Sequence, residues 1–117
     1  RDIGVTGVQT CALPIFTIAV SGDYGKPRPA IVIQSDHLNQ GDSVLVALLT
    51  STLIEAPYYR VSLDPDEQNG LRAQSQVMVD KILAVPRSKC GPVIGSIGET
   101  ALAALNQMLV VMIGLAD

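Results

Sequence analysis

Aromatic residues are scarce in this 117-residue chain, which has no tryptophan, one phenylalanine and three tyrosines. We therefore do not expect an aromatic platform that stacks successive bases. Two cysteines and one histidine are too few for a four-ligand zinc site built from Cys and His alone, and two cysteines give no disulfide framework. The longest apolar runs, residues 44–49 and 108–113, fall far short of the roughly 20 residues that a membrane-spanning helix needs.

The charge balance excludes one class of nucleic-acid binder. Eight basic and eleven acidic residues give a formal net charge of −3, so a basic surface covering the whole molecule is excluded, whereas a local basic site is not. Hydrophobic residues make up 48% of the chain and charged residues 16%. This composition supports one packed core and argues against intrinsic disorder, and the length suits a single domain.

Residues 1–15 (RDIGVTGVQTCALPI) differ in character from the rest of the chain. The run VTGVQTCALPI resembles the translation of a common sequencing-library adapter. A signal peptide fits poorly, because Asp2 lies in the region that should be basic and Gln9 and two glycines interrupt the apolar pattern. A genuine first strand is the remaining alternative. We expect residues 1–15 to be foreign, and residues 16–117 to form one domain that lacks its native N-terminus.

The remaining sequence alternates short apolar runs with turn-forming segments. Strands are expected at residues 16–20, 30–34, 43–50, 58–63, 76–85 and 93–97. Loops are expected at residues 21–29, 35–42, 51–57, 64–70 and 86–92. Pro27 and Pro29 are expected to keep the first of these loops out of regular pairing. The pattern predicts a mainly β (α+β) fold, a small and strongly bent antiparallel sheet or barrel.

Residues 99–115 predict the one clear helix. Its apolar stripe consists of Ala101, Ala104, Leu105, Met108, Met112 and Leu115. Ser96 and Glu99 fit a capping box, although Gly98 is an alternative N-cap, and Gly114 is expected to end the helix. Leu102, Leu109, Val110, Val111 and Ile113 fall off the stripe. Because the helix is apolar on more than one side, we expect a subunit contact in preference to complete burial.

Polar residues flank two of the predicted strands. Lys26 and Arg28 precede residues 30–34, and Thr50 and Ser51 end residues 43–51. If the two strands pair antiparallel, the start of one lies beside the end of the other, which puts Arg28 near Thr50 and Ser51. A guanidinium beside hydroxyls suits a phosphate. The alternative is a solvated loop arginine and an ordinary strand-end threonine.

Four segments carry a family resemblance in the correct order. They read KPRPAIVIQSD (26–36), VLVALLTS (44–51), GLRAQSQVMVDKI (70–82) and PRSKCGPVIGSI (86–97). Together with the terminal helix they resemble the MazF/PemK family of toxin endoribonucleases, except that the family's Arg-Gly-Asp-Ile-Val-like opening strand is absent. The resemblance implies an SH3-like small antiparallel β-barrel with a C-terminal α-helix, acting as a homodimer in the cytoplasm. It also implies cleavage of single-stranded RNA without metal or cofactor, and an antitoxin partner with an acidic, disordered tail.

The resemblance also implies roles for individual residues. The family's catalytic arginine and threonine fall on Arg28 and Thr50, and Ser51 matches the hydroxyl that often follows. Asp80 matches an acid that some members use, but Met78 replaces the arginine that accompanies it. The cations that could contact RNA are Lys26, Arg28, Arg60, Arg72, Lys81 and Arg87.

Two other functions stay open at this point. A CcdB-like gyrase poison shares the barrel, but such proteins end in a tryptophan-bearing tail and this chain ends GLAD. A non-catalytic binding module on the same fold is the third possibility. His37 stands alone and cannot form a histidine acid–base pair; we expect it to be exposed after the strand at residues 30–34.

Overall fold

The computed structural model describes residues 13–19, 27–34 and 41–115. In these residues the elements run β1 (Pro14–Ala19), β2 (Pro27–Val32), β3 (Ser43–Thr50), β4 (Arg60–Leu63), β5 (Ser75–Pro86), the 3₁₀ turn η2 (Arg87–Lys89), β6 (Cys90–Ser96) and α1 (Glu99–Met112). Lys26 and His37 lie outside the described residues, so the predictions made for them have no structural counterpart here.

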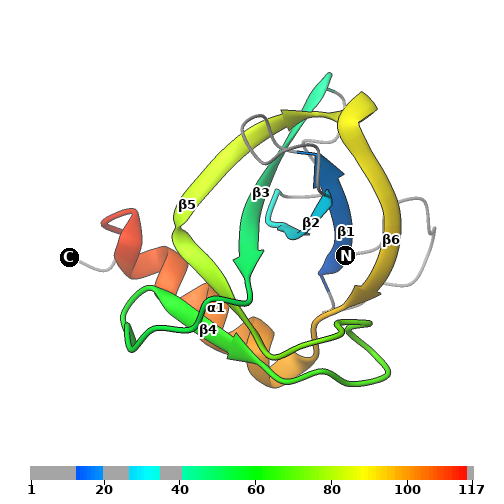
Figure 1. The fold of residues 1–117 in the computed structure, drawn as a ribbon. Helices are drawn as coiled ribbons and strands as arrows, with labels where there is room; N and C mark the ends of the chain where they lie inside the picture. The colour runs from blue at the N-terminus through cyan, green and yellow to red at the C-terminus, as the bar shows by residue number, and fades with distance from the viewer. Residues whose placement is uncertain (1–12, 20–26, 35–40, 116–117) are drawn as a thin grey trace.

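The strands form one sheet in the order β4-β5-β3-β2-β1-β6, and all neighbouring strands are antiparallel. Figure 1 shows that the sheet is strongly curved, with β5 and β6 on its two flanks and α1 beneath one end. The edge strands β4 and β6 do not pair with each other within the described residues, so regular pairing does not close the sheet. The prediction of a mainly β fold with one C-terminal helix is confirmed.

Both faces of the central strands carry buried side chains, as their unbroken apolar sequences predict. In β2, Ile31 joins a cluster that α1 covers with the fully buried Leu105, whereas Ala30 and Val32 join a second cluster that includes Phe16. Successive side chains of a strand point to opposite faces, so one strand serves both clusters. The helix therefore covers one face of the sheet, and the second cluster lies on the face that the helix does not cover.

The expected loop at residues 21–29 is wrong at its end, because β2 begins at Pro27. Pro27 pairs with Ala19 and Pro29 with Thr17 on β1. On its other side β2 pairs with β3 only from Ala30 onward. The proline segment is thus an edge with a single neighbour, where a missing N–H costs no ladder hydrogen bond.

Three other strands begin two or more residues away from the expected position. β4 begins at Arg60, two residues later than expected, after a turn at residues 57–59. β6 begins at Cys90, inside the expected break at residues 86–92. β1 begins at Pro14, and its fully buried Ile15 pairs with Ile31. The foreign origin of residues 1–15 stays a prediction; residues 13–15 of that segment lie in the described part of the chain.

At the start of α1 the structure has the alternative cap, Gly98, and not the capping box. Gly98 is the N-cap of α1, and the described residues make no side-chain capping bond there, so the expected box between Ser96 and Glu99 does not form. At the other end Gly114 adopts a φ of 79°, and its N–H donates to the Val111 carbonyl while the Leu115 N–H donates to Val110. This Schellman motif ends the helix, as predicted for Gly114.

The apolar stripe of α1 is confirmed in its first half only. Leu105 is buried and Ala101, Ala104 and Met108 pack against the core, but so do Leu102 and Leu109, which the stripe left out. The end of the helix and the residues after it are exposed, because they extend beyond the sheet. The exposed side chains there are Val110, Val111, Met112, Ile113 and Leu115.

Candidate active site

A cavity of about 630 Å³ lies at one end of the sheet, where β2 begins, β3 ends and β5 begins. It brings together Arg28, Thr50, Ser51 and Arg72 from three separate parts of the chain. Other polar lining residues are Thr17, Thr52 and Ser75. The arrangement combines two guanidinium groups with several hydroxyls, which is a donor set suited to a phosphate.

Strand register explains why Arg28 and Thr50 meet. Ala30 pairs with Leu48 on β3, and Val32 pairs with Val46. The pairing ends at Ala30, but an extension of its register by two residues puts Arg28 on the side of Thr50 and on the same face of the sheet, and both residues line the cavity. Both side chains are half-buried. The juxtaposition predicted from the antiparallel pairing of these strands is therefore present.

The hydroxyl of Thr50 is held by the chain that follows it. The Thr52 N–H donates to Thr50 Oγ1 over 3.1 Å. A hydroxyl has one donor and two acceptor lone pairs, so this bond uses an acceptor and leaves the proton of Thr50 for donation. The Thr50 hydroxyl can therefore donate a hydrogen bond to a phosphate oxygen, while a guanidinium in the cavity contacts the same phosphate.

Arg72 reaches the cavity through a well-bonded turn at residues 64–70. Asn69 is buried and organises this turn: Oδ1 accepts from the N–H groups of Asp66 and Leu71, and Nδ2 donates to the Asp64 carbonyl. The turn is anchored to β6, because the Ser96 N–H donates to the Gln68 carbonyl. Arg72 is exposed but its backbone is thus fixed beside the site.

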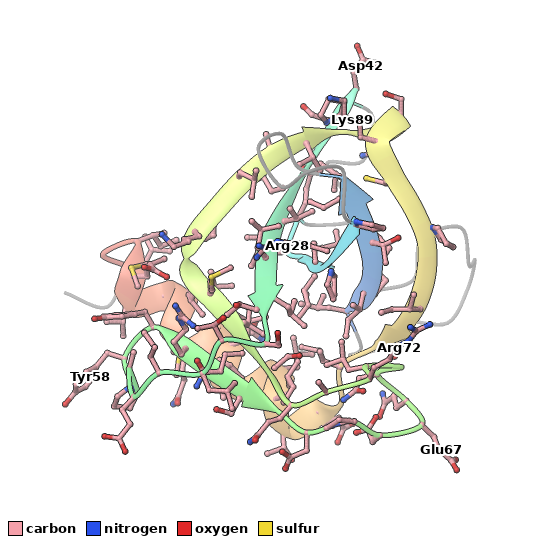
Figure 2. The ribbon with its side chains drawn as sticks, viewed as in Figure 1. Arg28, Asp42, Tyr58, Glu67, Arg72 and Lys89 are labelled. Atoms are coloured by element: carbon pink, nitrogen blue, oxygen red, sulfur yellow. The ribbon has the colours of Figure 1, made fainter. Side chains whose placement is uncertain are left out.

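Among the described residues, the other predicted RNA-binding cations are not gathered at the cavity. The Arg87 Nε–H donates to the Gly41 carbonyl, at the end of β3 where Ser43 pairs with Pro86. The eight residues of β3 place that end about 23 Å from Thr50 at the usual rise per residue. Figure 2 shows Lys89 and Asp42 at that distant end, Arg28 within the curve of the sheet and Arg72 near the opposite end.

Asp80 and Lys81 are both exposed on β5 and neither lines the cavity. They lie where the β3–β5 register is interrupted, between the Ala47–Ile82 pair and the Leu49–Val77 pair. Arg60 lies on the edge strand β4, and its Nη1–H donates to Gln76 Oε1 over 3.0 Å. The structure thus separates these three residues from the cavity that holds Arg28 and Thr50.

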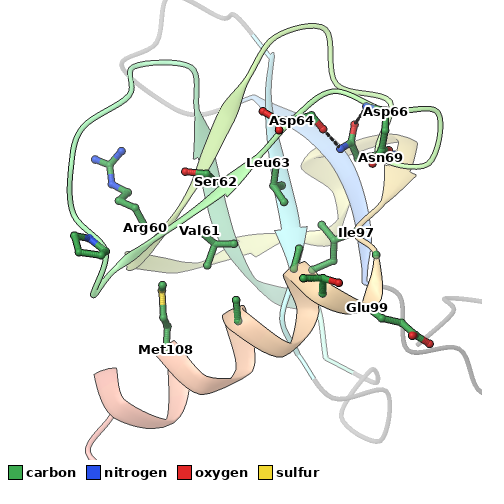
Figure 3. A pocket seen from close by; sticks show the side chains of 15 residues that line it. Arg60, Val61, Ser62, Leu63, Asp64, Asp66, Asn69, Ile97, Glu99 and Met108 are labelled. Carbon is green, nitrogen blue, oxygen red and sulfur yellow. Dashed lines mark hydrogen bonds between the residues drawn. The ribbon is translucent and has the colours of Figure 1, made fainter.

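A second groove, of about 690 Å³, runs between β4 and α1 (Figure 3). Asp64, Asp66 and Glu99 line it, and Arg60 is the one cation among the lining residues. An excess of carboxylates repels a polyanion, so this groove is the poorer candidate for RNA.

Cys90 is the free cysteine of the described residues. Partial burial raises the pKa of its thiol, and the nearby charge of Arg87 acts in the opposite direction. A raised pKa disfavours the thiolate, so the site gives no sign of a nucleophilic cysteine. No group of three or more His, Cys, Asp or Glu side chains in residues 13–19, 27–34 and 41–115 is placed to hold a metal ion. No helix in this part of the chain is long and apolar enough to span a membrane.

Sequence reasoning missed Thr17, Thr52 and Ser75 as lining residues and Gln76 as their neighbour. Serine and threonine in strands and loops carry no distinguishing sequence signal. Gln76 has one in principle, because it is a polar residue at the start of an otherwise apolar strand and is only 7% exposed.

Comparisons with known proteins agree with this geometry. Residues 10–113 match the family model described as PemK-like, MazF-like toxin of type II toxin-antitoxin system. The chain is 37% identical over 103 residues to a probable endoribonuclease MazF of Mycolicibacterium smegmatis, covering 87% of this chain and 94% of that protein.

Solved structures show the same fold. The Mycobacterium tuberculosis toxin MazF-mt6 is 24% identical, with a TM-score of 0.74 over 86% of this chain and 96% of its own. A mycobacterial endoribonuclease in complex with its cognate antitoxin is 18% identical, with a TM-score of 0.74 over 87% of this chain and 92% of its own. The family match and the curated relative together show that this chain belongs to the PemK-like, MazF-like toxins of type II toxin–antitoxin systems.

Proposed function

We propose that this toxin is a sequence-specific endoribonuclease that cuts single-stranded mRNA without a metal ion, using Arg28 and Thr50. The observation that carries the proposal is the cavity in which Arg28, Thr50, Ser51 and Arg72 meet. The curated relative, at 37% identity, is named as a probable endoribonuclease. In this chain, the three residues that we expect to carry out RNA cleavage, Arg28, Thr50 and Ser51, line the same cavity.

The chemistry follows from the charge that develops on the substrate. The 2′-hydroxyl of the RNA loses its proton to solvent and attacks the adjacent phosphorus, and negative charge builds on the non-bridging oxygens. The bond to the leaving 5′-oxygen then breaks, and that oxygen takes a proton from solvent, so the products are a 2′,3′-cyclic phosphate and a 5′-hydroxyl. The permanent charge of Arg28 stabilises that charge in the transition state. The Thr50 hydroxyl donates a hydrogen bond to a phosphate oxygen and so holds the phosphate in position, and Ser51 supplies a neighbouring hydroxyl. Because the nucleophile is the 2′-hydroxyl, DNA is not cut.

The remaining predicted residues have subsidiary places in this proposal. Arg72 binds a phosphate next to the one that is cut, and Lys26, two residues before Arg28 in the sequence, is proposed as a further phosphate contact. Asp80 does not line the cavity, so we give it no contact with the reacting atoms. Lys81 and Arg87 lie away from the cavity, and they are less favoured as RNA contacts than Arg28 and Arg72.

The proposed assembly is a cytoplasmic homodimer of SH3-like barrels. Exposed apolar side chains cluster at the end of α1 and just beyond it (Val110, Val111, Met112, Ile113 and Leu115), a surface that a second copy would bury. A structural neighbour is described as an endoribonuclease bound to its cognate antitoxin. By analogy, we propose an antitoxin whose acidic, disordered tail covers the RNA site and folds on binding.

The test is RNA cleavage in excess EDTA with a mixed-sequence transcript. Wild type should give discrete fragments with cyclic-phosphate or 3′-phosphate ends. Arg28→Ala should cleave about 10²–10³-fold more slowly while remaining folded, because removing one preorganised donor typically costs about 2.7–4 kcal/mol of barrier. Lys89→Ala is the matched control, since it removes an exposed cation at the distant end of the sheet. Intact RNA with folded wild type, or full activity of Arg28→Ala, contradicts the proposal.

A further inference from the structure

Polar side chains form a row across four strands on the face of the sheet that carries Arg28 and Thr50. Thr50 pairs with Gln76 on β5, and Gln76 pairs with Ser62 on β4. Since directly opposed residues of antiparallel strands share a face, the row runs from Arg28 through Thr50 and Gln76 to Ser62. Arg60, two residues before Ser62, lies on the same face.

Gln76 is the most buried member of this row, at 7% exposure, and its amide is fully engaged. Oε1 accepts from the Ile54 N–H over 3.1 Å and from Arg60 Nη1–H over 3.0 Å. Nε2 donates to the Ile54 carbonyl over 2.9 Å, with a longer contact of 3.5 Å to Ser62 Oγ. Two donors converge on one end of the amide and a carbonyl on the other, so the network permits one orientation of the group.

These bonds fix the segment that follows Thr50. The amide of Gln76 holds Ile54 by both its N–H and its carbonyl, in the manner of a strand partner. Arg60 Nη1 makes a second, longer link to the same segment at the Thr52 carbonyl, 3.4 Å away. The Thr52 N–H in turn donates to Thr50 Oγ1. A continuous chain of hydrogen bonds therefore connects Gln76 to the hydroxyl expected to bind the phosphate.

We propose that Gln76 is a positioning residue for RNA cleavage: its amide holds residues 51–54 against β5 and so fixes the Thr50 hydroxyl and the Ser51 side of the cavity. The inference rests on the proposed function. It also gives Arg60 a role through Thr52 and Gln76. Segments without regular structure need such tethers, because a loop has no ladder of its own to hold catalytic groups in place.

Two substitutions separate positioning from folding. Gln76→Met keeps the approximate length and volume and removes every hydrogen bond of the amide. Gln76→Glu keeps acceptors for Ile54 N–H and Arg60 but removes the donor to the Ile54 carbonyl. Gln34→Met is the matched control, because Gln34 Oε1 also accepts a backbone N–H, but from Leu45, near the end of β3 that is far from Thr50.

Three measurements are made at a temperature where every variant is folded by circular dichroism: kcat, KM and amide exchange at Ile54. In Gln76→Met, we expect kcat to fall by about tenfold to a hundredfold with KM changed less than about twofold, because misplacing a catalytic group by about 1 Å acts on the chemical step. The Ile54 amide should exchange faster while Val61 and Val77 stay protected. Gln76→Glu should fall between Gln76→Met and wild type, and Gln34→Met should match wild type.

Several outcomes overturn the proposal. An unchanged kcat in folded Gln76→Met does so, as does an Ile54 amide that stays protected. The proposal also fails if Gln76→Met and Gln34→Met lose the same amount of activity, because equal losses reflect general destabilisation. If wild type itself cuts no RNA, the proposed function fails separately, and exchange at Ile54 alone decides whether Gln76 holds the segment.

Discussion

The salt dependence of RNA binding distinguishes the cavity from the scattered surface cations. Two of the cations in the described part of the chain, Arg28 and Arg72, line the cavity, and Arg87 lies at the other end of β3. We predict that Arg72→Gln lowers the salt dependence of binding and that Arg87→Gln does not. The change to glutamine removes one charge in each case and keeps a polar side chain of similar reach.

The magnitude follows from counterion release. Each phosphate neutralised on a single strand contributes about −0.7 to the slope of log K against log salt concentration, so Arg28 and Arg72 together contribute about −1.4 per site. Between about 50 mM and about 200 mM salt, that slope predicts about a sevenfold loss of affinity, and about 2.6-fold after removal of one cation. Other cations at the site add to the wild-type slope but not to the difference between variants.

The assay is fluorescence anisotropy with an RNA carrying 2′-O-methyl groups, which lacks the attacking hydroxyl and is not cut. Each variant is titrated at several salt concentrations. Arg72→Gln should reduce the slope by about 0.7, and Arg87→Gln should leave it at the wild-type value. Equal reductions for the two variants would refute the reasoning, because they would mean that RNA contacts both ends of β3.

Two further predictions concern stability. Gly70 has a φ of 67° and no room for a Cβ beside the backbone of Ile94, so Gly70→Ala should lower the free energy of unfolding, measured in urea, by at least about 1–2 kcal/mol. Gly41→Ala is the control: its Cβ would meet only ordinary contacts, so the free energy of unfolding should change by less than about 0.5 kcal/mol. Similar losses in the two variants would contradict this account of the turn. Burial raises the pKa of the Cys90 thiol above its ordinary value of 9.0, so above that pH the unfolded chain loses the proton first and the free energy of unfolding falls as pH rises. Cys90→Ser should weaken this fall when unfolding is followed as the pH is raised through 9.0 and beyond, and identical pH profiles would contradict the assignment.

The fold could be predicted where apolar pattern and burial agree. The strand at residues 43–50 has the expected bounds, since its apolar run is buried on both faces. The start of β2 could not be predicted, because proline is barred from a strand only where a ladder partner needs its N–H, and whether Pro27 and Pro29 have a second neighbour depends on tertiary pairing. The burial of α1 could not be predicted either, because it depends on how far the sheet extends along the helix: the sheet covers only the first part.

The candidate site was predictable to the extent that it depends on one pair of strands. Arg28 precedes one apolar run and Thr50 ends the next, so antiparallel pairing of consecutive strands brings them together without further information. Arg72 was recognisable only as one cation among several. Its place in the cavity depends on the turn before it, in which Asn69 is buried and hydrogen-bonded and Gly70 lies against the backbone of Ile94.

The contribution of Gln76 depends on an interruption in strand pairing that no sequence pattern reveals. From Ser43 to Ala47, β3 pairs with β5 in a register that, if continued, would set Thr50 opposite the buried Val79. The register shifts by three residues before Leu49, so Thr50 pairs with Gln76 instead.

A shift by an odd number of residues moves each side chain to the other face of its strand. The bulge thus turns Val79 toward the core beneath α1 and Gln76 toward Thr50. Asp80 and Lys81 occupy the bulge itself, which explains why residues so near Gln76 in sequence stay outside the cavity.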